Sequence, residues 1–498
     1  MQRRTFLKNA LSACAATGAV LTAPSMLKAA SANNQGPNWS LGWQSVELDS
    51  FAPLAMSTSG FIPPDIQGML LRNGPAKMQR ADKHYRHWFD GDGMVQQFSF
   101  KNGQVAHQAK FVQTEKYQKE EAEGEFLYGG AGTVFKDSLP TSNNDSINTA
   151  NTALLHWDNE LLALWEGGSA YAMDAQSLAT KGLKTWRRDM KHMPFSAHPL
   201  IDASNGSMWN FGFAPYAGKG MLFVYHILPK VGVNKVEAIP LPISGYMHDF
   251  AQTKEHLIFL VPPYHYANNG GKNYVDRFVW QPELGSRLLV VSKNDLSQQQ
   301  WFELPAGFVF HFGHATQQKQ EISVNVSWYE TPSLMAEGMT ELMSTGQTKG
   351  DEHAVAATII ANLNTKQCSL VKSKLALEFP GFDEQNLQAD SSIIGVGRKT
   401  RENRFTSGTR MRHSDTLVSY QPESGKHKEY VYDYGTFAEE PLSIKGEKTD
   451  YIVQTYLDVI KHKSGINIFS RDHIDAGPIG QASMDRLIPL GFHGTFIA

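Results

Sequence analysis

The sequence is poor in cysteine, since only Cys14 and Cys368 occur among 498 residues. A disulfide framework and a metal site built on a cysteine cluster are therefore excluded. The chain also lacks an excess of basic charge, because 46 Lys and Arg residues are matched by 49 Asp and Glu residues. A nucleic acid is therefore not expected as a partner.

A long apolar run is also missing at the N-terminus, where the mildly apolar stretch 10–23 is too short and too polar to span a membrane. It follows a basic start that contains Arg3-Arg4, and small residues follow it up to Ala32. This order is typical of a secretory signal, and Arg-Arg-Thr-Phe-Leu-Lys resembles a twin-arginine signal for the export of folded proteins. We predict a signal peptide over residues 1–32, a periplasmic location and one mature domain over residues 33–498.

Long helical periodicity is absent from the mature chain, and short β-rich runs are separated by turn signals instead. One example is Phe98 to Val112, where Asn102-Gly103 separates two strand-like runs and predicts a hairpin. Many short strands without intervening helices predict an all-β fold, either a large barrel or a β-propeller. Helix-forming residues gather only between Tyr329 and Asp351, which predicts a helical excursion that covers a site.

Histidine, in contrast, is abundant, with 18 residues. Four of these histidines lie among turn-forming or apolar neighbours in four separate segments, namely His198, His248, His311 and His493. No His-Glu-x-x-His motif is present, which excludes a zinc-protease site on a single helix. Each histidine by itself is more often a hydrogen-bonded core residue than a metal ligand. A site made from all four would have to be assembled by the fold from different strands.

Several blocks of sequence, in chain order from Phe51 to the last residue, resemble the carotenoid cleavage oxygenase family, which includes the stilbene- and lignostilbene-cleaving dioxygenases. The blocks are Arg72-Asn73-Gly74-Pro75, His87 to Met94, Asn151-Thr152 with Leu162 to Gly168, and Pro489 to Phe496. The resemblance implies a seven-bladed β-propeller with a non-haem Fe(II) on its axis and with helical and loop excursions over the iron. The implied iron ligands are His198, His248, His311 and His493.

The resemblance also implies three carboxylates that accept hydrogen bonds from the ligand imidazoles, namely Glu166, Glu378 and Glu440. A buried glutamate in that position fixes the tautomer and the ring orientation of a ligating histidine. Without the resemblance, the same three residues would be interpreted as surface acids. One departure creates an ambiguity, because His314 stands where the family often has asparagine, only three residues from His311.

The activity implied by the resemblance is cleavage of a conjugated carbon–carbon double bond with O2, which gives two carbonyl products. The substrate would be hydrophobic and conjugated, either a carotenoid or apocarotenoid or a phenolic stilbene. Thr152 would lie beside the open position on the iron. Tyr85 and Lys116 would form a phenol-binding pair, because the stilbene-cleaving branch uses a tyrosine and a lysine. Carotenoids reside in membranes, so a peripheral membrane contact is also expected.

Two alternatives to this activity stay open at the level of sequence. A non-oxidative enzyme on the same fold, like the retinoid isomerohydrolase relatives, would turn over without consuming O2. A propeller that only binds a ligand would need no metal, although the presence of all four histidines argues against it.

Overall fold

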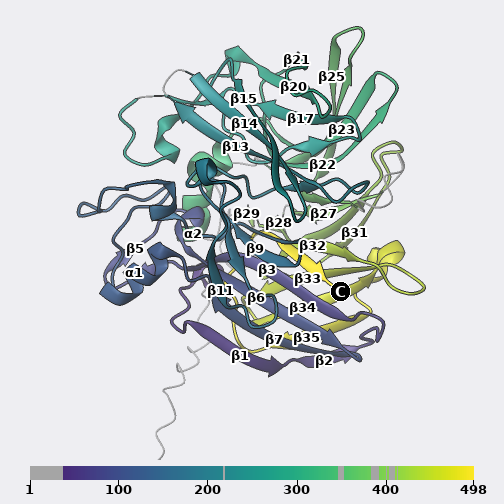
Figure 1. Ribbon diagram of the computed structural model, residues 1–498. Helices are drawn as coiled ribbons and strands as arrows, with labels where there is room; N and C mark the ends of the chain where they lie inside the picture. The colour runs from purple at the N-terminus through teal and green to yellow at the C-terminus, as the bar shows by residue number, and fades with distance from the viewer. Residues whose placement is uncertain are drawn as a thin grey trace, which may run out of the picture.

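The computed structural model describes residues 38–216, 219–267, 269–345, 353–382, 392–399, 401–402, 410–411 and 413–498. The predicted signal peptide, residues 1–32, lies outside these residues. Seven antiparallel sheets of four or five strands are arranged around a central axis, as Figure 1 shows in part. The all-β, seven-bladed β-propeller expected from the resemblance is therefore confirmed.

The second, third and fourth blades follow one another along the chain as meanders of strands from the axis to the rim, whereas the first blade takes its innermost strand from the C-terminus and its outermost strand from the start of the described chain. Their strands are, for the first blade, β36 (Gly494–Ile497), β3 (Gly68–Lys77), β6 (Asp92–Lys101), β7 (Gln104–Phe111) and β1 (Ser50–Ala55); for the second, β8 (Ala153–Trp157), β9 (Glu160–Leu164), β10 (Tyr171–Met173) and β11 (Thr180–Leu183); for the third, β12 (Leu200–Ile201), β13 (Met208–Tyr216), β14 (Lys219–Leu228) and β15 (Gly232–Pro240); for the fourth, β16 (Ala251–Gln252), β17 (His256–Val261), β20 (Ser286–Ser292) and β21 (Gln299–Leu304).

The remaining three blades complete the ring. Their strands are β22 (Phe308–Gln318), β23 (Glu321–Tyr329), β24 (Val355–Asn362) and β25 (Gln367–Ala376); β26 (Glu378–Gly381), β27 (Ile393–Gly397), β30 (Thr416–Tyr420) and β31 (His427–Val431); and β32 (Thr436–Ile444), β33 (Tyr451–Asp458), β34 (Lys463–Ser470), β35 (Gly480–Met484) and β2 (Ser57–Gly60). Three two-stranded ribbons lie outside the blades, namely β4 (Gln79–Arg80) with β5 (Lys83–His84), β18 (Tyr264–Tyr266) with β19 (Phe278–Trp280), and β28 (Arg401–Glu402) with β29 (Arg410–Met411).

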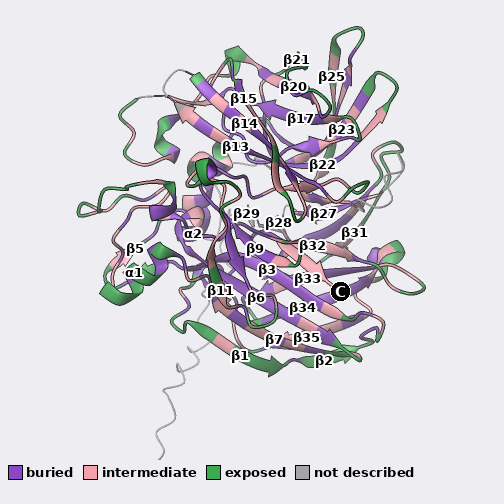
Figure 2. Cartoon of the chain, in the orientation of Figure 1, coloured by how far each residue is buried: buried purple, intermediate pink, exposed green. Residues whose placement is uncertain are grey.

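The ring is closed by strands from both ends of the described chain. Strand β2 pairs with β35 of the last blade, and the C-terminal strand β36 pairs with β3 of the first blade. Figure 2 shows that the centres of the blades are buried, whereas β1 and β2 at the rim are mostly exposed. Because β36 is the innermost strand of its blade, the closure brings the C-terminal segment to the propeller axis.

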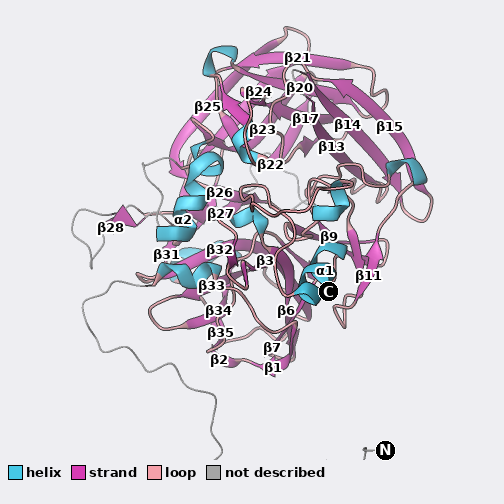
Figure 3. Cartoon of the chain, turned by 90° about the vertical axis from the view of Figure 1, so that its left-hand side faces the viewer, coloured by secondary structure: helices cyan, strands magenta, loops and turns pink. Residues whose placement is uncertain are grey.

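Helices are few among the described residues, and the two α-helices lie on the side of the propeller that faces the viewer in Figure 3. Helix α1 (Glu115–Glu123) is capped at its start by the Thr114 hydroxyl, which accepts a hydrogen bond from the backbone N–H of Tyr117. The helical excursion expected after Tyr329 is present as a π-turn, Leu334–Gly338, followed by α2 (Met339–Thr345). Among the described residues, no helix combines the length and the apolar character needed to cross a membrane.

Candidate metal centre

The fold gathers the four predicted histidines at the propeller axis. One ring nitrogen from each of the four lies within 4.8 Å of those of the others, although the residues come from four different blades. His198, His248 and His493 each lie one to three residues before the innermost strand of a blade, and His311 lies within β22. The innermost strands of neighbouring blades contact one another, so side chains from distant segments meet on the axis.

Three of the four imidazoles are held by the three predicted carboxylates. The Nδ1 atom of His248 lies 2.7 Å from Glu166 Oε2, and the Nδ1 atom of His311 lies 2.6 Å from Glu378 Oε2. The Nδ1 atom of His493 lies 2.8 Å from Glu440 Oε1.

The fourth imidazole, that of His198, has only a distant carboxylate, with 3.9 Å between its Nδ1 and Asp249 Oδ1.

The nitrogens that face the axis are suited to a cation. The Nε2 atoms of His198 and His248 are 3.0 Å apart, and those of His311 and His493 are 3.1 Å apart. In the neutral form, an imidazole that donates through Nδ1 has no proton on Nε2. His311 and His493 therefore turn two bare lone pairs toward each other, an arrangement that a metal ion between them stabilises. Imidazole ligands suit iron, zinc, copper and nickel.

The electrostatics favour a neutral imidazole at two of the four positions, whereas at His311 burial, which lowers the pKa, is outweighed by the hydrogen-bonded Glu378 carboxylate, so that the pKa is raised. Burial, reinforced by the neighbouring imidazoles, lowers the pKa of His198 and of His493 well below the ordinary value. Burial raises the pKa of Glu440 to about 7, although the nearby Arg72 opposes that shift. A cation bound by the four imidazoles would favour the ionised form of the same carboxylate.

Further groups, which the sequence analysis did not identify, hold the three carboxylates. Tyr246 donates its hydroxyl proton to Glu166 Oε1 at 2.6 Å. The backbone N–H of Phe379 donates to Glu378 Oε2 at 2.7 Å, and that of Gly494 donates to Glu440 Oε2 at 2.7 Å. Each donor lies one or two residues from a predicted site residue, so proximity in sequence was the available signal for all three.

The ambiguity between His311 and His314 is resolved by position. His311 is one of the four clustered histidines, whereas His314 lies outside the cluster, with its ring centroid 5.5 Å from that of Phe382. The ring of Phe379 stacks on the ring of His311, with 4.8 Å between the two ring centroids. Phe379 has a φ of +51°, a left-handed conformation that is uncommon for a bulky residue and that typically marks a functional site.

Thr152 lies next to the cluster. Its backbone carbonyl accepts a hydrogen bond from the N–H of His493 at 3.2 Å, and its hydroxyl donates to Asn151 Oδ1 at 3.1 Å. Its side chain lines both cavities that reach the histidines. This placement is compatible with a role of Thr152 beside the open metal position, and that role stays a prediction.

Tyr85 and Lys116 are brought together, with the ammonium nitrogen 5.2 Å from the centre of the tyrosine ring. The Lys116 ammonium donates to Asp92 Oδ1 at 2.7 Å and to Glu120 Oε2 at 2.8 Å, and its side chain is fully buried. The Tyr85 hydroxyl donates to the carbonyl of Tyr128 at 3.2 Å. The ammonium and the hydroxyl of the pair are thus largely hydrogen-bonded within the protein. The role of the pair in binding a phenol stays a prediction.

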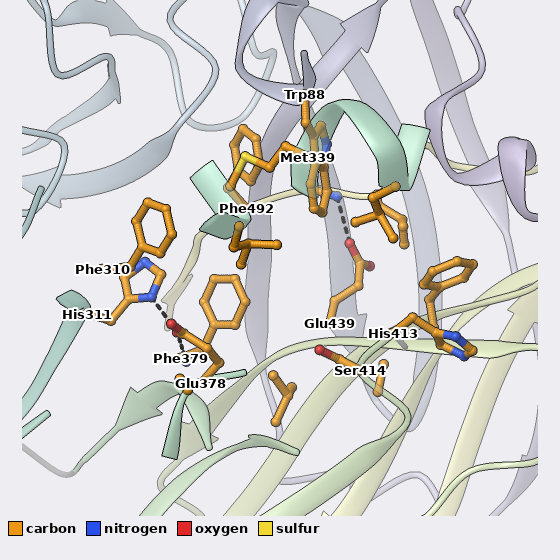
Figure 4. Close-up of a pocket in the computed structure, with 18 of the residues that line it drawn as sticks. Trp88, Phe310, His311, Met339, Glu378, Phe379, His413, Ser414, Glu439 and Phe492 are labelled. Atoms are coloured by element: carbon orange, nitrogen blue, oxygen red, sulfur yellow. Dashed lines mark hydrogen bonds and ion pairs between the residues drawn. The ribbon is translucent and has the colours of Figure 1, made fainter. Parts of the chain in front are cut away.

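Two cavities meet at the histidines. One, of about 200 Å³, is lined by His248, His311 and His493 together with aromatic and aliphatic side chains. Figure 4 shows His311 and Glu378 on one side of this cavity and Glu439, His413 and Ser414 on the other. The second cavity, of about 440 Å³, also reaches His248 and Thr152 and includes Lys116 in its lining.

Comparison with known proteins supports the family resemblance that the sequence shows. The family model described as retinal pigment epithelial membrane protein matches residues 44–498. The apocarotenoid-15,15'-oxygenase of a Synechocystis strain is 27% identical over 92% of this chain and 96% of its own length. The isoeugenol monooxygenase of Pseudomonas putida is 29% identical over 54% of this chain and 57% of its own length.

Among solved structures, a cobalt-substituted Synechocystis protein abbreviated ACO superimposes with a TM-score of 0.79 at 24% sequence identity. The match covers 92% of this chain and 98% of that one, and it shows a common fold. Since the family model spans nearly the whole chain and the propeller holds four clustered histidines on its axis, the chain belongs to the retinal pigment epithelial membrane protein family of carotenoid cleavage oxygenases.

Proposed function

We propose that this protein is a non-haem Fe(II) dioxygenase that cleaves a conjugated carbon–carbon double bond of a hydrophobic substrate with O2 and releases two carbonyl products. The observation that carries the proposal is the set of four imidazoles whose Nε2 atoms face a common centre. Family membership supports an oxygenase that cleaves double bonds. One solved protein of the same fold is described as cobalt-substituted, which is consistent with a transition metal bound to this fold.

The residues that would hold the iron are His198, His248, His311 and His493. Bound Fe(II) would supply the centre at which O2 is activated. Four neutral imidazoles leave the charge of the ion uncompensated, and Glu166, Glu378 and Glu440 supply negative charge through the imidazoles that they hydrogen-bond. Each carboxylate also fixes which ring nitrogen is free to bind the metal.

The cavity lined by three of the histidines would hold the substrate. Its aromatic lining, which includes Trp88, Phe310 and Phe492, suits a flat conjugated molecule and excludes water from the reacting bond. The relatives are named for both substrate classes, since one is an apocarotenoid oxygenase and another is a resveratrol cleavage oxygenase of Aspergillus fumigatus. Both an apocarotenoid and a phenolic stilbene are therefore substrates to test.

The experiment combines metal analysis with an oxygen electrode. Purified protein should carry about one iron per chain, and it should consume one O2 for each pair of aldehydes formed from a stilbene or an apocarotenal. Product formation without oxygen uptake would instead support the isomerohydrolase-like alternative. Full turnover by a preparation free of iron would contradict the proposal.

We also propose that residues 1–32 direct export to the periplasm by the twin-arginine route, a proposal supported by the sequence pattern alone. The full-length chain should appear in the periplasmic fraction of a bacterium with an intact twin-arginine pathway. Replacing Arg3 and Arg4 by lysine should retain the protein in the cytoplasm. Equal periplasmic yield of the wild type and the Lys-Lys variant would contradict this route.

A further inference from the structure

An arginine is buried at the seam between the first and the last blades. Arg72 lies on β3, is only 4% exposed, and stands opposite Gly494 in the pairing of β3 with β36. Its guanidinium donates from Nε to Glu439 Oε1 at 3.1 Å, from Nη1 to the carbonyl of Glu440 at 3.2 Å and from Nη2 to the carbonyl of Phe492 at 2.9 Å. One side chain therefore connects β3 with β32 and with the segment that precedes β36.

Two of these bonds hold the two partners of one hydrogen bond at the metal centre. Glu440 is the carboxylate that lies 2.8 Å from His493 Nδ1, and Phe492 directly precedes His493 in the chain. Arg72 therefore holds the backbone of the carboxylate residue and the backbone beside the ligand residue at the same time. A guanidinium is planar and presents its N–H groups in a fixed fork, so it keeps the two carbonyls at a fixed separation.

Glu439, which the sequence analysis did not identify, neutralises the guanidinium and contacts the same segment. Its Oε1 accepts the hydrogen bond from Arg72 and another from the N–H of Gly491 at 2.7 Å. Strand β32 has a β-bulge at this point, where three steps on β32 face two steps on β33. Residues of a regular strand alternate between the two faces of the sheet, whereas a bulge re-aims one of them. The bulge therefore allows the consecutive residues Glu439 and Glu440 to reach the segment that carries His493.

The backbone of this segment is also held closely against β3. The N–H of Asn73 donates to the carbonyl of His493 at 2.9 Å, and the N–H of Phe492 donates to the carbonyl of Asn73 at 2.8 Å. A Cβ atom at Gly491 would lie only 2.9 Å from Arg72 Nε and 2.8 Å from the carbonyl oxygen of Asn73. Because the packing leaves no slack, a change in the position of Arg72 is transmitted to the ligand segment.

We propose that Arg72 is a positioning residue for the metal ligand His493. Its bonds to the carbonyls of Glu440 and Phe492 fix the ligand residue and its carboxylate relative to each other, so that the imidazole Nε2 faces the other histidines. In this role Arg72 acts through His493 and does not itself bind the metal. The inference deepens the proposed function and rests on it, because it requires a metal at the four histidines.

A buried arginine that only stabilises the fold is the appropriate comparison, and Arg80 is such a residue. It is 5% exposed, its Nη1 is paired with Glu121, and its Nη2 lies 3.5 Å from Asp92 Oδ2. Replacing either arginine should lower the stability of the fold, because each change removes a buried cation that carboxylates face. Only the replacement of Arg72 should also alter the metal site.

The test compares the two arginines in the full chain, which is freed of metal and titrated with Co(II) in the absence of O2. Co(II) is the probe because its visible absorption responds to the number and geometry of its ligands. Arg72→Met should raise the dissociation constant for Co(II) about 10–100-fold, the scale typical of groups that orient a metal ligand. Arg80→Met should change that constant by no more than about threefold, because no described hydrogen bond links it to the four histidines.

The decisive measurement is a double-mutant cycle with the ligand itself. If Arg72 acts through His493, Arg72→Met should change Co(II) affinity by less than about threefold in a His493→Ala background. In a His198→Ala background the full effect should persist, since none of the described hydrogen bonds joins Arg72 to His198. The absorption spectrum of Co(II)-loaded Arg72→Met should also approach that of His493→Ala, which a loss of stability alone would not cause.

Arg72→Lys provides a second variant in case Arg72→Met does not fold. Lysine keeps a positive charge near Glu439 but loses the planar fork, so Co(II) should bind at least about fivefold more weakly than in the wild type. Glu439→Gln should retain the metal, because its amide oxygen can still accept from Arg72 and Gly491. Wild-type Co(II) affinity in Arg72→Lys overturns the inference. An equal effect of Arg72→Met in the His493→Ala and His198→Ala backgrounds overturns it as well, as does an equal effect of Arg80→Met.

Oxygen uptake is measured separately on iron-loaded samples of the same preparations. Normal oxygen uptake together with unchanged Co(II) affinity in Arg72→Met removes this inference and leaves the proposed function. Co(II) binding that depends on Arg72, without oxygen uptake by the wild type, removes the proposed function and leaves the role of Arg72 in the metal site. Wild-type Co(II) affinity in His493→Ala contradicts both, because His493 would then not be a ligand.

Discussion

Two buried polar clusters of this protein differ in how their charged groups and lone pairs are matched within the protein. In the cluster around Lys116, two cations and two anions are paired, with Lys116 bonded to Asp92 and Glu120, and Arg80 lying 3.5 Å from Asp92. In the histidine cluster, the Nε2 atoms of His311 and His493 face each other at 3.1 Å, and two neutral rings that donate through Nδ1 place no proton between them. In the first cluster each charge lies beside one of opposite sign, although Arg80 Nε and Nη2 and Asp92 Oδ2 have no hydrogen-bond partner among the described residues. In the second cluster the facing imidazole nitrogens lack a positive charge between them, which a bound cation would supply.

The comparison has a general lesson about buried charge. Both clusters are buried and both contain carboxylates, so burial and composition do not distinguish a structural cluster from a functional one. The distinguishing feature is whether the buried groups face groups of opposite charge, as in the cluster around Lys116, or face like lone pairs, as in the histidine cluster. Four experiments test this distinction.

The largest effect is expected when a ligand of the histidine cluster is removed. His311→Ala should lose most of its bound iron, and activity should fall by more than the roughly 100-fold typical of changes outside the ligand sphere. His314→Ala, the matched control three residues away, should keep its iron, since His314 lies outside the cluster. Metal analysis and turnover measurements on both variants check this. Iron loss in His314→Ala but not in His311→Ala would show that the wrong member of the pair is assigned.

The next effect concerns the paired cluster. Lys116→Met should lower the free energy of unfolding by about 3–5 kcal/mol, because it leaves Asp92 and Glu120 as buried carboxylates without their cation. Bound iron should not change in the folded protein. Urea unfolding and metal analysis provide the readouts. Normal stability combined with a loss of preference for phenolic substrates would instead support the predicted phenol-binding role of Lys116.

A smaller effect is expected at the carboxylates that hold the imidazoles. Glu378→Gln should lower iron affinity or turnover about 10–100-fold, because a neutral amide accepts the His311 hydrogen bond more weakly than a carboxylate does. The control is Glu439→Gln, an equally buried glutamine substitution with no bond to an imidazole, which should keep its iron. Wild-type iron affinity in Glu378→Gln would refute the role assigned to this carboxylate.

The smallest effect is expected for Tyr85→Phe. This variant loses one hydrogen bond, from the Tyr85 hydroxyl to the carbonyl of Tyr128, which is typically worth about 1 kcal/mol of stability. Turnover of a phenolic substrate should change by no more than about threefold. A drop of tenfold or more that is confined to phenolic substrates would return Tyr85 to the substrate site.

Local sequence signals predicted the strands well. The hairpin expected between Phe98 and Val112 is present as β6 and β7, with Asn102 and Gly103 both at positive φ in the turn. The Asn-Gly pair determines such a turn because both residues tolerate the left-handed conformation. The helical stretch after Tyr329 was also predicted, and described residues of it line the cavity.

The site was accessible from the sequence only through the resemblance to a family. No spacing rule connects His198 to His493, because the residues meet through the closure of a ring whose last strand, β36, pairs with β3. The same limit applied to Glu439, whose position depends on a β-bulge that pairing with β33 reveals. Arg72 was quoted within a motif, yet its ion pair with Glu439 joins the first blade to the last.

The sequence by itself determined the all-β character, the turns and the supply of histidines and carboxylates, because these follow from residue types and short-range periodicity. Only the folded propeller determines which of those polar groups lie beside an opposite charge and which lie beside a like lone pair. Hydrogen-bond satisfaction depends on distances between atoms of different blades, and no local pattern encodes them. For that reason Lys116 and His311, both buried polar residues, are assigned different roles only once the propeller has closed around them.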